Sequence, residues 1–246
     1  MTRDDVEKQT VAFLRTARGT RPDLRVVEIG GRRTVVKDFR RSDPLFRLLV
    51  GPILVRRERG ALARLRAVEG VPQFIETIDR YAIAVEHVDG RSLGDVRELV
   101  PERFFDRLAE VVERVHERGV AHCDLRNLGN VIVASDGEPH IIDFAGCVIR
   151  GRGWNPFINF LFRQFALADL YAVLILKRKH APDLLRAEEL DRIEASLPYE
   201  RIAIRVGTGL RKLAKRLLTR RDPEPGPPDT ATHDLPPPDT EPRPVV

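Results

Sequence analysis

The sequence predicts a protein of the α+β class, because stretches with the periods of strands and of helices both occur in one chain of 246 residues. Residues 34–39 alternate like a half-buried strand. Residues 104–116 carry apolar side chains at helical intervals. Two short apolar runs, 131–133 and 140–142, are spaced like the strands of a hairpin. A chain of this length is long enough to bury a core of its own.

Further elements follow from the same patterns. The strand at 34–39 comes after a turn signal, Gly30-Gly31. Residues 54–65 have helical spacing, with Val55, Leu62 and Leu65 on one side. The apolar run that begins at residue 81 fits a buried strand, which Asp89-Gly90 ends. The helix at 104–116 is expected to stop at Gly119, a C-terminal cap.

Charge is unevenly distributed along the chain. Residues 222–246 are rich in proline and acids, a composition that predicts a disordered tail. This segment has a net charge of −5. Since the whole chain has a net charge of +5, residues 1–221 carry about +10. Basic surfaces attract nucleotides, anionic lipids and nucleic acid alike, but no stacking aromatics are interleaved with these residues, which disfavours nucleic acid. The basic residues form three clusters: Arg40, Arg41, Arg47, Arg56, Arg57 and Arg59; Arg150 and Arg152; Arg211, Lys212, Lys215, Arg216, Arg220 and Arg221.

Compartment is indicated by cysteine usage and by the lack of long apolar runs. Cys123 and Cys147 are expected to be free thiols in a reducing cytosol. The N-terminus has no apolar signal segment, and the longest apolar run, 157–176, is interrupted by Arg163 and Asp169. We therefore expect a cytoplasmic protein, with peripheral contact to the inner face of the membrane through the arginine clusters as an alternative.

Two neighbouring motifs carry the strongest chemical signal. The first is His-Cys-Asp-Leu-Arg-Asn-Leu-Gly-Asn at 122–130, and the second is Ile-Ile-Asp-Phe-Ala-Gly at 141–146. They place Asp124, Asn130 and Asp143 on two turns joined by the expected hairpin. Phosphoryl transfer from a nucleotide needs one carboxylate to orient and deprotonate a hydroxyl, and an Asn and a second carboxylate to hold magnesium. Either motif alone also fits Asp and Asn residues that cap turns.

The order of these residues resembles the catalytic loop and the metal loop of the protein-kinase-like superfamily. The resemblance implies a two-lobed fold, with a small antiparallel-sheet N-lobe at about 1–86 and a mainly helical C-lobe at about 90–221. It implies ATP and Mg²⁺, or Mn²⁺ in its place, as ligands. Asp124 would be the base, and Asn130 and Asp143 the metal ligands.

The spacing of residues in the loop at 122–130 indicates which group of the superfamily the chain resembles. Asn130 lies six residues after Asp124 instead of five, as in bacterial RIO-type and lipopolysaccharide-kinase-type proteins. Asn127 is a competing ligand, but Asn130 leads directly into the strand and is preferred. Arg126 stands where many kinases carry a Lys that touches the transferred phosphate, which a guanidinium can also contact.

The resemblance implies further nucleotide contacts upstream. Lys37, in the strand at 34–39, would contact the α- and β-phosphates, with Glu58 of the next helix as its partner. The backbone of Glu86 and Val88 would bind adenine. No Gly-x-Gly-x-x-Gly precedes Lys37, and only Gly19 offers a turn between the first two strands.

Downstream, the Ala-Pro-Glu anchor of protein-recognising kinases is absent from the sequence. Asp169 resembles the residue that begins the central C-lobe helix and holds the catalytic loop. The sequence thus predicts an ATP-dependent kinase that acts on a hydroxyl of a protein Ser/Thr, a lipid or a sugar. The alternative is a pseudokinase, a nucleotide-binding scaffold without turnover, because the phosphate-covering loop lacks its glycines.

Overall fold

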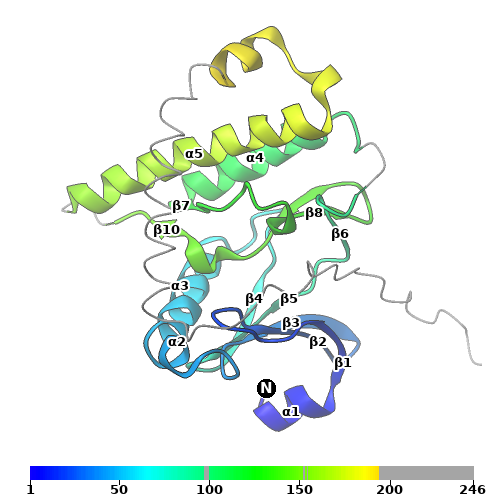
Figure 1. Ribbon diagram of the computed structural model, residues 1–246, viewed down its shortest axis with the longest axis vertical. Coiled ribbons are helices and arrows are strands. Elements are labelled where there is room, and N and C mark those ends of the chain that lie inside the picture. The colour runs from blue at the N-terminus through cyan, green and yellow to red at the C-terminus, as the bar shows by residue number, and fades with distance from the viewer. Residues whose placement is uncertain (97–99, 152, 154, 194–246) are drawn as a thin grey trace, which may run out of the picture.

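The N-terminal half of the chain forms an antiparallel sheet of five strands. This computed structural model describes residues 1–193, except 97–99, 152 and 154. The strand order is β1-β2-β3-β5-β4, so β3 lies at the centre of the sheet (Figure 1). The strands are β1 (Thr10–Arg15), β2 (Asp23–Ile29), β3 (Arg32–Asp38), β4 (Phe74–Asp79) and β5 (Ala82–Glu86).

The turn between β2 and β3 confirms the predicted glycine signal. Gly30 and Gly31 have φ values of +58° and +75°. A two-residue hairpin with two positive φ angles matches the twist of the strands that it joins, and glycine adopts it without steric cost. The turn sets the register that pairs Lys37 with Leu24 of β2. On its other side Lys37 pairs with Ile83 of β5.

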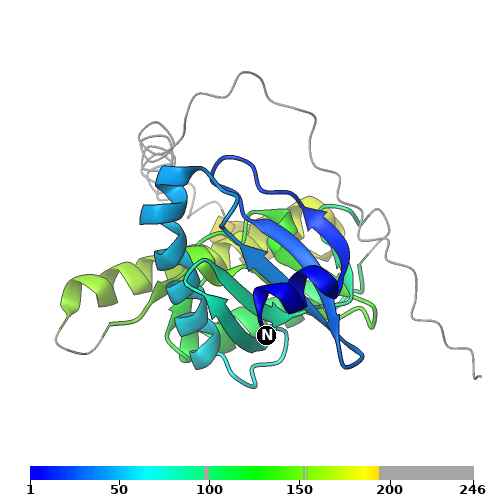
Figure 2. The same cartoon turned by 90° about the horizontal axis from the view of Figure 1, so that it is seen from below.

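Helices pack on opposite faces of this sheet. On one face, α1 (Arg3–Lys8) buries Val6 against Val27, Val36 and Ala84. Figure 2 shows α1 lying across the strands. The other face meets α3 (Gly51–Arg64), which follows the short α2 (Pro44–Leu49). The sequence analysis did not predict α1, although Thr2, three residues before Asp5, forms its capping box.

The C-terminal half is mainly helical. Its long helices α4 (Phe104–Glu117) and α5 (Pro156–His180) lie side by side (Figure 1). Gly119, with φ +74°, follows α4 and confirms the predicted end of that helix. Small sheets and single turns complete the lobe: β6 (Gly90–Ser92), β7 (Val120–Ala121), β8 (Val131–Ala134), β9 (Pro139–Ile141), β10 (Val148–Ile149), η1 (Leu128–Asn130), η2 (Phe144–Gly146) and η3 (Pro182–Leu184).

One hydrophobic core runs through both lobes. Val55 and Leu62 of α3 belong to the same buried cluster as Leu108 of α4 and Val173 of α5. Phe144, in η2 directly after Asp143, is completely buried in that cluster. Because burying a Phe side chain is worth roughly 1.5–3 kcal/mol, this contact fixes the loop that carries Asp143. The predicted α+β architecture, with an antiparallel-sheet N-lobe and a mainly helical C-lobe, is confirmed.

The start of the central helix was predicted wrongly. α5 begins at Pro156, thirteen residues before Asp169, which lies in its middle. Asn155 caps the helix by accepting the Ile158 N–H at 3.1 Å. Asp169 interrupts the apolar run in the sequence, but it is 2 % exposed and hydrogen-bonded inside the fold, so it does not break the helix.

Judged by length and composition alone, α5 is the one helix among the described residues that could cross a membrane. Its most apolar 18-residue window has a mean hydropathy of 1.4, and 22 % of that window is buried. Arg163 and Asp169, which interrupt the apolar run, are therefore too few to exclude α5 as a membrane-spanning helix by composition. Residues 194–246, with the third basic cluster and the predicted tail, lie outside the described residues.

Candidate active site

Lys37, Glu58 and Asp143 meet between the two lobes. Lys37 Nζ lies 2.6 Å from Glu58 Oε1 and 3.1 Å from Asp143 Oδ1. Strand β3, helix α3 and the loop before η2 each supply one of the three side chains. Glu58 is 2 % exposed, so it points into the protein and does not pair with the arginines beside it in α3. The sequence predicted these three residues, and the structure brings them together.

Electrostatics keep the ammonium and the loop carboxylate charged. Burial by itself lowers the pKa of Lys37, but the charges of Asp143 and Glu58 outweigh it and hold the pKa above its ordinary value. The Lys37 charge holds the pKa of Asp143 below its ordinary range, against the effect of burial. The Asp143 side chain is 45 % exposed, so a charged oxygen atom can be reached from solvent.

Asp124 and Asn130 face each other across the loop between β7 and β8. Asn130 Nδ2 donates to the backbone oxygen of Asp124 at 3.0 Å and to its Oδ2 at 3.3 Å. Asn130 is 5 % exposed. Asn127 instead caps η1, where its Oδ1 accepts the Gly129 N–H at 3.2 Å. Asn127 meets Asp124 through its backbone N–H, which donates to the Asp124 carbonyl at 3.2 Å, whereas the Asn130 side chain contacts the Asp124 carboxylate itself.

A buried carboxylate holds the catalytic loop. Asp169 accepts the N–H groups of His122 at 2.7 Å and of Cys123 at 2.9 Å, the contact that the resemblance implied. His122 Nε2 lies 2.9 Å from the Ile142 carbonyl oxygen, and the imidazole ring packs on Phe144. His122 thus links the two loops by a hydrogen bond and by ring packing.

Backbone strain is concentrated in the same place. Of the three non-glycine residues with positive φ in the described chain, Cys123 (+72°) and Asp143 (+69°) belong to the site. Each such conformation costs about 1–3 kcal/mol and persists only where neighbours enforce it. The sequence analysis missed this feature, since no sequence pattern marks Cys or Asp for a left-handed conformation.

The two cysteines are free thiols, as predicted. Burial raises the pKa of Cys123 far above its ordinary value and that of Cys147 to about 12. Burial thus disfavours the reactive thiolate form of both cysteines.

The donor set suits a hard divalent cation bound together with phosphates. The backbone carbonyl oxygen of Asn130 accepts the Ile142 N–H at 2.9 Å, so Asn130 lies beside the residue that precedes Asp143. One amide and one carboxylate are oxygen ligands of the kind that Mg²⁺ takes, with phosphate and water oxygens filling its other positions. Within the described residues, no three His, Cys, Asp or Glu side chains gather as a metal cage.

The adenine contacts and the outer residues are less constrained. The Glu86 N–H donates to the Gln73 carbonyl at 2.9 Å, so any contact of Glu86 with adenine falls to its carbonyl oxygen. Val88 lies half-buried between β5 and β6, in the segment between the two predicted lobes. Arg126 is exposed on the catalytic loop. Gly19, with φ +57°, lies in the turn between β1 and β2. The roles of these residues remain predictions.

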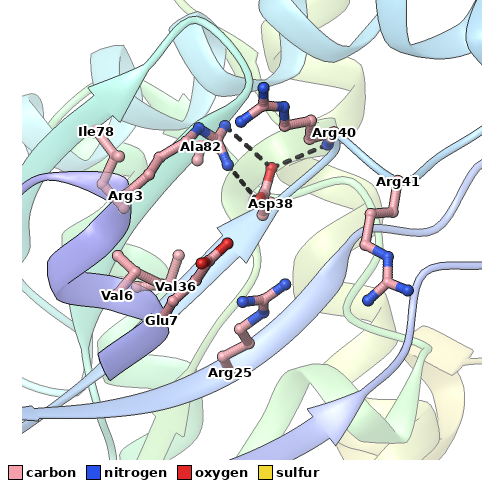
Figure 3. A pocket seen from close by; sticks show the side chains of 10 residues that line it. All are labelled: Arg3, Val6, Glu7, Arg25, Val36, Asp38, Arg40, Arg41, Ile78 and Ala82. Atoms are coloured by element: carbon pink, nitrogen blue, oxygen red, sulfur yellow. Dashed lines mark hydrogen bonds and ion pairs between the residues drawn. The ribbon is translucent and has the colours of Figure 1, made fainter. Parts of the chain in front are cut away.

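A cavity of about 210 Å³ lies on the other face of the sheet, beside α1, and contains none of the predicted site residues. Figure 3 shows Arg3 reaching Asp38 across it. Arg3 Nη1 lies 2.7 Å from Asp38 Oδ2, and Arg3 Nη2 lies 2.6 Å from Asp79 Oδ2. These ion pairs hold α1 on the sheet. The lining residues are Arg3, Val6, Glu7, Arg25, Val36, Asp38, Arg40, Arg41, Ile78 and Ala82.

The two-lobed fold, with Lys37, Glu58, Asp124, Asn130 and Asp143 at its candidate site, is of the kinase-like class, and its loop at 122–130 has an atypical spacing. Residues 31–158 match the RIO domain family, and because this match covers more than half of the chain, the protein belongs to that family.

A crystal structure of the Rio2 kinase–ADP/Mg²⁺–phosphoaspartate complex from Chaetomium thermophilum shares the fold, with a TM-score of 0.52 and 17 % sequence identity. The match covers 72 % of this chain and 58 % of that one, so the chain spans little more than half the length of that kinase.

Proposed function

We propose that this protein is an ATP-dependent kinase that transfers the γ-phosphate to a hydroxyl acceptor. The observation that carries the proposal is the contact of Lys37 with both Glu58 and Asp143, across elements 21 and 106 residues apart in sequence. A buried lysine paired to an acid of the neighbouring helix, with a loop carboxylate within reach, is the arrangement that active kinases assemble around nucleotide phosphates.

Each residue of the site has a distinct task in this proposal. Lys37 contacts the α- and β-phosphates, and Glu58 holds its ammonium in place. Asn130 and Asp143 would bind Mg²⁺, which supplies charge neutralisation for the phosphates. Asp124 accepts the proton of the attacking hydroxyl, and its carboxylate is oriented by the amide of Asn130 at 3.3 Å. The ADP and Mg²⁺ named for the Rio2 complex support these ligands.

The segment after the metal loop favours a compact acceptor. β10 begins at Val148 and pairs at once with β7, and α5 begins at Pro156. Few residues therefore separate the metal loop from the core helices to form a platform for a folded protein substrate. We propose a sugar hydroxyl, a lipid hydroxyl or an exposed Ser/Thr as the acceptor.

The test uses purified full-length protein, labelled ATP, Mg²⁺ and a lysate separated into protein, lipid and small-molecule fractions. Asp124→Asn should reduce transfer at least about a thousandfold while nucleotide affinity changes by less than about 1 kcal/mol, because the lost oxygen acts in chemistry and not in binding. Asp183→Asn, an exposed carboxylate in η3, is the matched control and should leave transfer unchanged.

Two other results would contradict the proposal. Magnesium-dependent nucleotide binding without transfer to any fraction indicates the pseudokinase. Label that stays on the protein itself and is released by hydroxylamine indicates an acyl phosphate, as in the phosphoaspartate named for the Rio2 complex, and not a phosphorylated hydroxyl.

A further inference from the structure

Helix α2 and the first turn of α3 expose a group of large apolar side chains. Leu45, Leu48, Leu49 and Ile53 are 48 %, 59 %, 51 % and 55 % exposed in the described structure. Leu45, Leu48 and Leu49 lie at positions i, i+3 and i+4 and so share one face of α2. These four residues form what we call the α2 face.

Packing among the described residues does not account for the α2 face. The helix already buries a different residue, Phe46, which is 8 % exposed and stacks near Phe39 with ring centroids 6.1 Å apart. A helix on the surface of a domain needs one apolar side toward the core, and its other side is ordinarily polar. A second apolar side of leucine and isoleucine therefore indicates an external contact.

The segment that carries the α2 face is rich in arginine. Residues 39–57 contain five arginines and one acid, Asp43, for a net charge of +4. Arg40, Arg41 and Arg56 are exposed, and Arg47 Nη1 donates to the Arg40 carbonyl at 3.0 Å. Arg41 has 64 % of its side chain in solvent, lies 4.0 Å from Asp23 Oδ2 through its Nε, and with Arg40 also lines the cavity beside α1. The net charge of the segment is thus positive, which complements an anionic surface.

We propose that the α2 face docks onto a membrane leaflet that contains anionic lipids. Leu45, Leu48, Leu49 and Ile53 enter the boundary between headgroups and acyl chains, and the flanking arginines bind lipid phosphates. Apolar residues combined with arginines in one short segment are the composition that interfacial helices use, whereas a neutral protein partner gives no reason for a net positive charge. Glu58 points from α3 into the active site, so docking leaves its pairing with Lys37 intact.

The experiment measures co-sedimentation of the full chain with vesicles in the absence of nucleotide, so that it does not depend on kinase activity. One set of vesicles is phosphatidylcholine, and the other contains phosphatidylserine as about a third of the lipid. The protein should bind the second set at least about tenfold more tightly than the first, and added salt should weaken the binding.

Variants separate the α2 face from other exposed surfaces. Leu48→Gln with Leu49→Gln, and separately Arg41→Gln with Arg56→Gln, should each weaken binding at least about tenfold. Glutamine is a good helix former at exposed positions, and an unchanged thermal midpoint confirms folding. The matched control, Phe157→Gln with Phe160→Gln, removes side chains that are 65 % and 57 % exposed on α5 and should bind like wild type.

Four outcomes would overturn the proposal. The first is no binding of wild type to either vesicle, which leaves the α2 face to a protein or to another part of this chain. Equal binding to both vesicle types would remove the role of the arginines. Loss of binding in the Phe157/Phe160 variant but not in the Leu48/Leu49 variant would move the contact to α5. Unaltered binding in the Arg41/Arg56 variant would contradict binding through these arginines.

Discussion

Two ion-pair triads lie back to back on strand β3 and share the same chemistry. On one face Lys37 lies between Glu58 and Asp143, and on the other face Arg3 lies between Asp38 and Asp79. Lys37 and Asp38 are consecutive, and successive side chains of a strand point to opposite faces. Each triad contains one cation, one carboxylate that is less than a tenth exposed and one that is a third or more exposed.

The two triads differ in what their second carboxylate is attached to. Asp79 is the last residue of strand β4, so the Arg3 triad joins α1 to the sheet and contacts neither of the two loops of the candidate site. Asp143 has a left-handed backbone and lies on a loop that His122 hydrogen-bonds to the catalytic loop. A buried cation between two acids therefore does not by itself define an active site. The loops that its partners belong to decide whether it can act on a ligand.

The largest expected effect comes from Asp143→Asn. Because a neutral amide cannot offset the charge of a metal ion and phosphates, magnesium-dependent nucleotide binding should be lost and turnover should fall at least about a thousandfold. Isothermal titration with and without Mg²⁺ measures the first effect. If nucleotide binding does not depend on Mg²⁺ and is unchanged by the substitution, Asp143 is not a metal ligand. The Lys37 triad would then have no demonstrated role beyond the structural one of the Arg3 triad.

A smaller effect is expected from Asn130→Ala, which should lower turnover about a hundredfold through loss of a charge-stabilising group. Asn127→Ala should change turnover by less than about threefold, because its side chain caps a turn and its loss costs mainly stability. Steady-state kinetics of the two variants show which Asn supports turnover. The reverse ranking would assign the metal to Asn127.

On the opposite face, Arg3→Gln should leave turnover within about twofold of wild type. It should lower the free energy of unfolding by about 1–3 kcal/mol, since it leaves Asp38, which is 5 % exposed, without its charged partner. Denaturant unfolding measures this loss. A large fall in kcat without a loss of stability would mean that the Arg3 triad also serves the reaction.

Comparison of particular elements shows how far the sequence reaches. The helix at 104–116, the hairpin around 131–142 and the turn at Gly30-Gly31 were predicted to within a few residues, since their signals lie in near neighbours. The start of α5 was missed because Asp169 reads as an interruption until its hydrogen bonds to His122 and Cys123 are known. Helix α1 was missed because six residues leave little periodicity to detect.

The sequence was enough to predict the class of the fold and, through the family resemblance, the candidate site residues Lys37, Asp124, Asn130 and Asp143, because motif order and residue spacing are properties of the chain. Only the tertiary structure decided that Lys37 contacts Asp143, 106 residues away, and that Asp38 points to the opposite face. It also decided which leucines of α2 stay in solvent. Contacts of that separation depend on how helices and sheet pack around a common core, and local patterns in a sequence carry no record of that packing.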